Sequence, residues 1–133
     1  MLASFEAEKE GDVAKNAELL HEDFKVVDMV IAQDGSIFPT LEASKLKEQI
    51  DTAFKIEGRE FTFKTVVADE STQTVVVEFI ESYPDPETSQ LYRTPQVAIC
   101  QIKDGKIYRT RHYMDPRLSY ENLSQSQIEK ALE

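Results

Sequence analysis

Residues 91–114 read LYRTPQVAICQIKDGKIYRTRHYM, two long runs of alternating side chains separated by Lys-Asp-Gly. Both runs are rich in β-branched and aromatic residues, which are common in strands. The Asp-Gly pair provides the residues that a tight turn between antiparallel strands requires. The stretch therefore predicts a hairpin with strands at 91–103 and 106–114.

The same alternation extends toward the N-terminus, in EFTFKTVVA (60–68) and TQTVVVEFIESY (72–83). ADEST forms a tight connection between these two runs, and PDPETSQ forms a looser one to the next strand. Consecutive hairpins predict a coiled antiparallel sheet of four to six strands. Strands of about 9–12 residues exceed the usual five or six, and such long strands coil into a sheet with a concave face.

Helical patterns precede these strands. Asp12 follows Gly11 and is a suitable N-cap for a helix, and a second helix is expected from Thr40 to Gly58. DFKVVDMVI between them has the pattern of a strand, and QDGS that of a turn. A capping box predicts a short final helix at about 124–132. The order indicates one α+β domain over 1–133, with N-terminal helices packed across the concave face around a conical pocket.

Composition excludes several classes of function. The 133 residues carry a formal charge of −10, which disfavours nucleic acid and anionic membranes as partners. We find no membrane span, secretion signal, metal-ligand spacing or cofactor motif, so we expect a cytoplasmic protein without metal or cofactor. The single cysteine, Cys100, lies in an apolar run and is expected to fill the core. His21 follows a helix and is interpreted as structural.

The order helix, Gly-Asp, helix, LLHEDFKVVD, helix and four strands ending in DGKIYRTRHYMDP resembles the superfamily of nuclear transport factor 2. Its SnoaL-like group, ketosteroid isomerases and limonene epoxide hydrolases are the most similar members. The resemblance covers roughly Phe5 to Leu118. It implies the cystatin-like fold of a curved sheet around a pocket, which agrees with the pattern of elements.

The resemblance also implies roles for three residues. Asp28 falls where ketosteroid isomerases hold a proton-shuttling carboxylate, and Glu81 falls close to an aspartate of the epoxide hydrolases. His112 stands where those hydrolases and similar polyketide cyclases hold a catalytic aspartate. Two positions depart from the family. Ser4 replaces the isomerase tyrosine and Phe79 replaces the hydrolase arginine, so neither catalytic set is complete.

Strand alternation gives a separate reason to consider two of these residues. His112 lies on the face opposite to Arg109 and Arg111, and two unpaired arginines are unlikely to face a dry cavity. His112 is therefore expected to point inward, either as an acid–base group or as a hydrogen-bonded structural residue. Glu81 shares a face with apolar side chains, where a carboxylate is costly unless it is paired or reaches water at the strand end. Asp28 could likewise end its strand in solvent.

These considerations predict a cofactor-independent isomerase, cyclase or hydrolase that acts on a small hydrophobic, oxygenated metabolite. Asp28 and His112 would act as base and acid, in either order, and Glu81 would orient His112. The alternatives are a non-catalytic ligand carrier and a dimeric protein-binding scaffold. Arg109, Arg111 and Tyr113 on the outer sheet face suggest a homodimer. The residues expected to line the pocket are Phe79, Tyr83, Tyr108, Thr110 and Met114.

Overall fold

A computed structural model describes residues 1–29, 41–42, 54–85, 87–114 and 125–131. Its helices and strands follow the expected order of N-terminal helices before long strands. In chain order, these elements are α1 (Leu2–Glu10), α2 (Val13–Leu19), β1 (Leu20–Met29), β2 (Leu41–Glu42), β3 (Glu60–Asp69), β4 (Thr74–Pro84), β5 (Leu91–Lys103), β6 (Lys106–Met114) and α4 (Gln125–Ala131).

The strands form one sheet in the order β2-β1-β6-β5-β4-β3. The hairpins predicted from the sequence are confirmed, because β3 to β6 pair with their neighbours in antiparallel register. The sheet as a whole is mixed, however, since β1 pairs with β6 in parallel. A tight turn determines the relative direction of consecutive strands, whereas β1 and β6 are far apart in the chain, so their pattern left the direction open.

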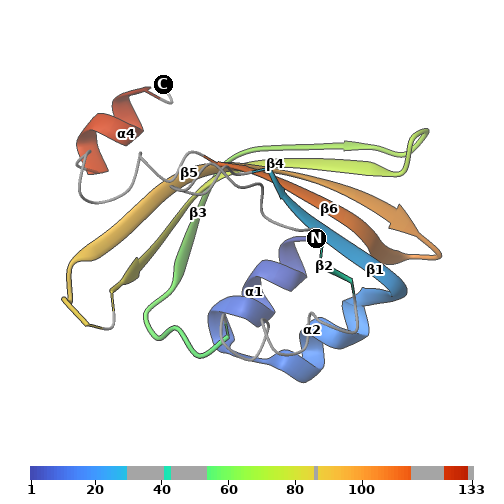
Figure 1. Ribbon diagram of the computed structural model, residues 1–133. Helices are drawn as coiled ribbons and strands as arrows, with labels where there is room; N and C mark the ends of the chain where they lie inside the picture. Colours follow the sequence, from blue (N-terminus) through green and yellow to red (C-terminus); the bar gives the residue numbers. More distant parts are fainter. Residues whose placement is uncertain (30–40, 43–53, 86, 115–124, 132–133) are drawn as a thin grey trace.

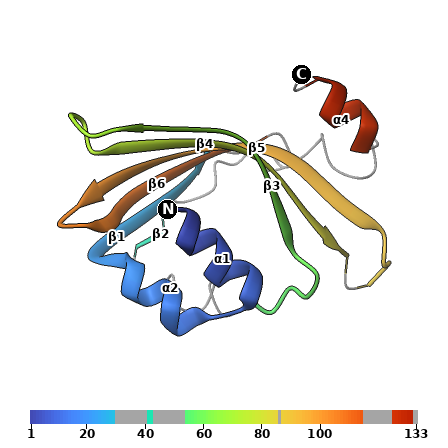
Figure 2. The same cartoon turned by 180° about the vertical axis from the view of Figure 1, so that it is seen from behind.

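The sheet curves over α1 and α2, which lie beneath its concave side in both views, while α4 lies on the other side (Figures 1 and 2). This arrangement confirms the α+β fold with a curled sheet. None of the helices in the described part of the chain combines the length and apolarity that a bilayer crossing requires.

A short connection orients α1 and α2. Gly11 ends α1 with a φ of 71°, in the left-handed region, and a Cβ there would lie 3.0 Å from the carbonyl oxygen of Phe54. Asp12 then caps α2 as expected, because its Oδ1 accepts a hydrogen bond from the Lys15 N–H at 2.9 Å. Gly11 therefore serves both the turn and the close approach of a second segment.

The ends of the helix expected over 40–58 have a different structure. Residues 41–42 are extended and pair with Lys25 and Val26 of β1, and residues 54–58 contain turns. Residues 43–53 and the expected turn at 33–36 lie outside the described residues. The expected C-terminal helix is present as α4.

Shifts in register interrupt the alternation of side chains at three places in the described part of the sheet. One lies in β3 between Phe63 and Thr65, opposite β4, and a second lies between β5 and β6 at Gln101 and Ile102. A third lies in the pairing of β1 with β6, between Leu20 and Lys25. An extra residue at a bulge changes which face the following side chains occupy. The second bulge affects one predicted site residue, Tyr108.

Candidate functional site

An aromatic cluster connects the concave face of the sheet to α1. The ring of Phe5 lies 4.8 Å from that of Phe79, 4.9 Å from that of Phe61 and 5.4 Å from that of Phe63. Phe5 and Phe79 are buried. One helix side chain thus inserts among rings from β3 and β4 and defines the concave face as the interior.

His112 lies on this concave face, as the alternation predicts. It is half-buried in β6, its register partner on β5 is the fully buried Ala98, and its ring centroid is 6.5 Å from that of Phe79. On its other side, the parallel register pairs His112 with Asp28 of β1. The backbone of Asp28 is described, but its side chain is not. The topology therefore brings these two predicted residues to neighbouring positions.

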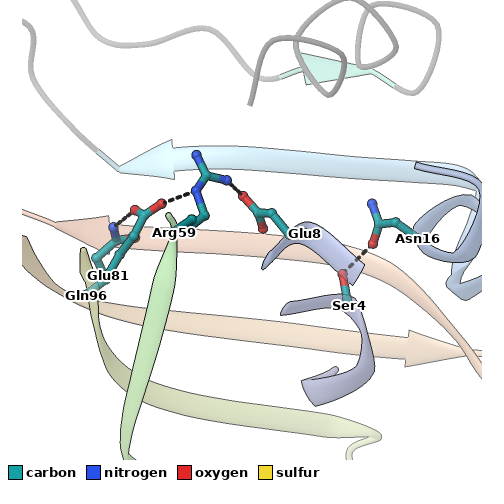
Figure 3. Close-up of polar contacts among 6 residues, drawn as sticks. All are labelled: Ser4, Glu8, Asn16, Arg59, Glu81 and Gln96. Atoms are coloured by element: carbon teal, nitrogen blue, oxygen red, sulfur yellow. Dashed lines mark hydrogen bonds and ion pairs between the residues drawn. The ribbon is translucent and has the colours of Figure 1, made fainter. Parts of the chain in front are cut away.

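Glu81 is the second predicted residue on this face, and it has two partners that the sequence interpretation did not name. Its side chain is only 15% exposed, and its Oε2 accepts a hydrogen bond of 2.6 Å from Gln96 Nε2. Its Oε1 lies 3.2 Å from Arg59 Nε as an ion pair (Figure 3). Two partners of Glu81 are thus a guanidinium and an amide. Its role in orienting His112 stays a prediction.

Arg59 is a site residue that the sequence interpretation missed. It is buried at 5% exposure and also pairs through Nη1 with Glu8 Oε1, and its guanidinium carbon lies 5.5 Å from the ring centroid of Tyr83. Figure 3 shows this guanidinium between the two carboxylates, one from α1 and one from β4. The sequence contained a usable indication, since Arg59 continues the alternation of the inward-facing Phe61 and Phe63.

Two buried polar atoms near Glu81 have no hydrogen-bond partner in the described structure. They are Arg59 Nε, whose contact with Glu81 is an ion pair only, and the hydroxyl of Thr94, the register partner of Glu81 on β5. Unsatisfied buried polar groups are rare in proteins and often mark functional positions. This end of the concave face is therefore more polar than a packed core requires.

Glu8 was also missed, because it lies on a helix that was interpreted only as a cover for the sheet. Burial raises the pKa of the Glu8 carboxyl to about 7. The attraction of Arg59 opposes this rise only in part, and the neighbouring Glu81 adds to it. At neutral pH the site thus contains one guanidinium between a carboxyl that titrates there and the carboxylate of Glu81.

Stability should therefore depend on pH through Glu8. The pKa is raised in the folded state, so the folded protein binds more protons than the unfolded chain between about pH 4.5 and 7, and the free energy of unfolding should fall as pH rises through this range. We expect Glu8→Gln to flatten this slope, by roughly 1–3 kcal/mol across the range. Urea unfolding at half-unit pH steps would measure it. If the free energy of unfolding changed equally with pH in Glu8→Gln and in wild type, Glu8 would not be the group responsible. Glu6→Gln, at an exposed position of the same helix, is the control and should keep the wild-type slope.

The predicted lining residues fall in two groups. Tyr83 stacks on Tyr92 at 4.6 Å and carries the Arg59 guanidinium over its ring, so it belongs to the polar end of the face. Met114 is half-buried and pairs in register with the buried Gln96. Thr110 is buried, with its hydroxyl 3.3 Å from the thiol sulfur of Cys100. Both Met114 and Thr110 thus lie on the same face as His112.

Cys100 fills the core, as predicted. It is fully buried, and burial raises the pKa of its thiol to about 11. The group therefore stays a thiol at neutral pH, and a thiol is a poor nucleophile.

Tyr108 lies elsewhere. Its ring makes an edge contact with His21 at 5.4 Å and lies 5.1 Å below the ammonium of Lys103, near the start of β6. The bulge at Gln101 and Ile102 explains the difference, because it breaks the alternation that grouped Tyr108 with His112. His21 has the structural role expected of it, since it is buried and its Nδ1 accepts a hydrogen bond from the Asp23 N–H.

Ser4 occupies the position where the resemblance would place an oxyanion-stabilising tyrosine. Its hydroxyl donates a 2.6 Å hydrogen bond to Asn16 Oδ1 and so joins α1 to α2 (Figure 3). Within the described residues there is no group of three or more potential metal ligands. The site residues in hand are thus carboxylates, a histidine, an arginine and aromatic rings.

A curled sheet over two helices, with polar side chains gathered on its concave face, defines the class of nuclear transport factor 2-like proteins. The model of the SnoaL-like domain matches residues 1–110, and the chain belongs to this family. A search of the curated proteins returns no significant match.

Solved structures share the fold. An isomerase candidate from Bacillus subtilis has a TM-score of 0.72 at 24% identity, over 89% of this chain and 87% of that one. AusH from Aspergillus nidulans has a TM-score of 0.70 at 14% identity, over 86% and 80%. SalBIII, an epoxide hydrolase/cyclase-like enzyme in pyran ring formation in salinomycin, has a TM-score of 0.69 at 16% identity, over 84% of both chains. At these identities the likeness shows the fold alone.

Proposed function

We propose that the protein is a cofactor-independent SnoaL-like enzyme that moves protons on a small hydrophobic, oxygenated molecule, by isomerisation, ring closure or water addition. The observation that carries this proposal is the place of His112, half-buried beside Phe79 on the concave face with Asp28 as its register partner. Histidine titrates near neutral pH, and a carboxylate beside it would act as its proton partner.

The carboxyl groups at the other end of the face support the same chemistry. Partial burial raises the pKa of Glu8 to about 7, although Arg59 pairs with Glu8 as well as with Glu81. A carboxyl group with a pKa near neutral pH is suited to acid–base catalysis. Phe79 and Tyr83 would supply an apolar wall between the two ends, suited to a largely hydrocarbon substrate.

The related structures agree with this class of reaction. These structures include an isomerase candidate and an epoxide hydrolase/cyclase-like enzyme of pyran ring formation. Such reactions need a proton donor and acceptor at fixed positions, and need neither metal nor redox cofactor.

Three simple probes would test the proposal. Cyclohex-3-en-1-one tests isomerisation, which is followed by the absorbance of the conjugated ketone. Cyclohexene oxide tests water addition, and 4-penten-1-ol epoxide tests ring closure. We expect turnover above buffer with at least one probe. His112→Ala and Asp28→Asn should each lower kcat/KM by about 100-fold or more. Arg111→Gln, at the adjacent strand position on the opposite face, is the matched control and should keep its activity.

Equal turnover by wild type and His112→Ala would contradict the catalytic role.

One observation favours a second candidate function, a ligand carrier. The Ser4 hydroxyl is hydrogen-bonded to Asn16, and Phe79 packs in the aromatic cluster. Neither residue therefore supplies the catalytic polar group, the tyrosine or the arginine, that the related enzymes hold at these positions. For a carrier, native mass spectrometry should find a co-purified ligand that His112→Ala retains, without turnover of any probe.

A further inference from the structure

The concave face changes from packed core to polar groups along the pairing of β4 with β5. From the core outward, this register pairs Phe79 with Gln96, Glu81 with Thr94, and Tyr83 with Tyr92. Phe79 and Gln96 are buried, whereas the two tyrosines are half-buried, so exposure increases toward this end of the strands. Glu81 and Thr94, which we call the polar row, thus lie between the core and the tyrosines.

Two buried atoms at the polar row are unsatisfied. The Thr94 hydroxyl is completely buried, Arg59 Nε belongs to a side chain that is 4% exposed, and neither atom has a hydrogen-bond partner in the described structure. Both adjoin Glu81, since Nε lies 3.2 Å from its Oε1 and Thr94 is its register partner (Figure 3). An unpaired buried polar group is destabilising, and proteins keep few of them outside functional positions.

Glu81 decides which kind of ligand oxygen suits this row. A carbonyl or ether oxygen beside its carboxylate would set lone pairs against lone pairs, and a second carboxylate would add like charge. A hydroxyl can donate to the carboxylate while its oxygen accepts from Thr94 or from Arg59 Nε. The Glu81 side chain is 15% exposed, so the row is not sealed from solvent. The groups present therefore favour a neutral alcohol.

The polar row is distant from His112. The register partner of His112 is Ala98, which lies on the same face of β5 as Thr94 but four positions further along the chain. At the usual rise per residue of a strand, this separation is about 13 Å. The row of Phe79 and Gln96 lies between the two positions. A molecule that reaches from His112 to the polar row is therefore elongated, and it passes the Phe79 ring.

We propose that Thr94, with Arg59 and Glu81, binds a hydroxyl group at the far end of an elongated, largely hydrocarbon substrate. This assignment rests on the proposed function, because it takes His112 as the position of the reacting end. Thr94 and Arg59 Nε donate to the hydroxyl oxygen, and the hydroxyl donates to Glu81. Thr94 is thus a specificity-determining residue that selects long alcohols over acids and ethers of the same length.

Decan-1-ol and its methyl ether, 1-methoxydecane, test this role, since they share one apolar chain and differ only in the hydroxyl proton. Chemical-shift titration of the ¹⁵N-labelled protein gives both dissociation constants. We expect decan-1-ol to shift the amides of residues 81, 94 and 96 and to bind at least tenfold more tightly than the ether. Thr94→Val should weaken decan-1-ol binding at least fivefold. Thr62→Val, the same change at an exposed position of β3, is the matched control and should leave it unchanged.

Thermal unfolding of the ligand-free protein separates ligand binding from a structural role. Because the Thr94 hydroxyl has no partner, Thr94→Val should keep or raise the Tm. A lower Tm with unchanged decan-1-ol binding would show that the hydroxyl holds an internal water only, and would overturn the proposal. Equal binding of the two probes, or binding of neither, would overturn it as well. None of these readouts requires turnover, so they are distinct from a failure of the acid–base role of His112.

Discussion

Arg59→Met should be among the most destabilising single substitutions in this protein, with an expected loss of about 3–5 kcal/mol in the free energy of unfolding. The side chain is 4% exposed and is the cation paired with both Glu8 and Glu81. Methionine has a similar length but no charge, so two poorly solvated carboxyl groups would lose their partner. Urea unfolding at pH 7.5, where Glu8 is largely ionised, measures the loss.

The same structure predicts how to reverse this loss. Replacing a whole buried ion-pair group with neutral residues is often nearly neutral, because most of the cost comes from the charge left behind. Glu8→Gln and Glu81→Gln combined with Arg59→Met should therefore recover most of the stability. Low pH should act in the same direction, since protonation of Glu8 below its pKa of about 7 removes one of the two charges.

Arg109→Met provides the matched control, because it makes the same chemical change at an exposed position of the sheet. We expect its effect to remain within about 0.5 kcal/mol. If both arginine variants lost the same amount, or if the triple variant were no more stable than Arg59→Met alone, the carboxylates would not be the cause. The Arg59 prediction would then be wrong in its mechanism as well as its magnitude.

The sequence predicted the fold because alternating side chains and turn residues identify each strand and its hairpin locally. Alternation over 91–103 and 106–114 gave two strands with the bounds of β5 and β6, and turn residues gave their antiparallel pairing. The parallel pairing of β1 with β6 was missed, because no turn joins them. The place of His112 on the concave face followed from the same period of two.

The site was less predictable, because its contacts join residues far apart in the chain. Glu8 and Arg59 are 51 positions apart, and only the packing of α1 against the sheet brings them together. Alternation did mark Glu81 as an inward carboxylate that needs a partner, but it could not say that this partner is Arg59. It also misplaced Tyr108, since a bulge depends on the register between two strands and leaves no mark in one strand's pattern.

Phe79→Ala is the second prediction with a large effect, an expected loss of about 3–5 kcal/mol. Phe79 is 1% exposed and lies within 6.5 Å, between ring centroids, of Phe5, Phe61, Phe63 and His112. Truncation removes the central ring of this cluster and leaves a cavity that the sheet backbone can fill only in part. Since small domains are stable by about 5–15 kcal/mol, much of the folded state's margin would be lost. Thermal and urea unfolding would measure it.

Phe79→Leu separates packing from function at this position. Leucine fills more of the cavity than alanine, so it should cost clearly less stability, while it still removes the ring that faces the His112 imidazole. Val67→Ala, at a sheet position that is 55% exposed, is the control for apolar truncation and should cost well under 1 kcal/mol, roughly the few tenths typical of surface changes. If Phe79→Ala lowered the free energy of unfolding no more than Val67→Ala does, the aromatic cluster could not be what holds α1 against the sheet. The concave face would then need another support to hold His112 in place.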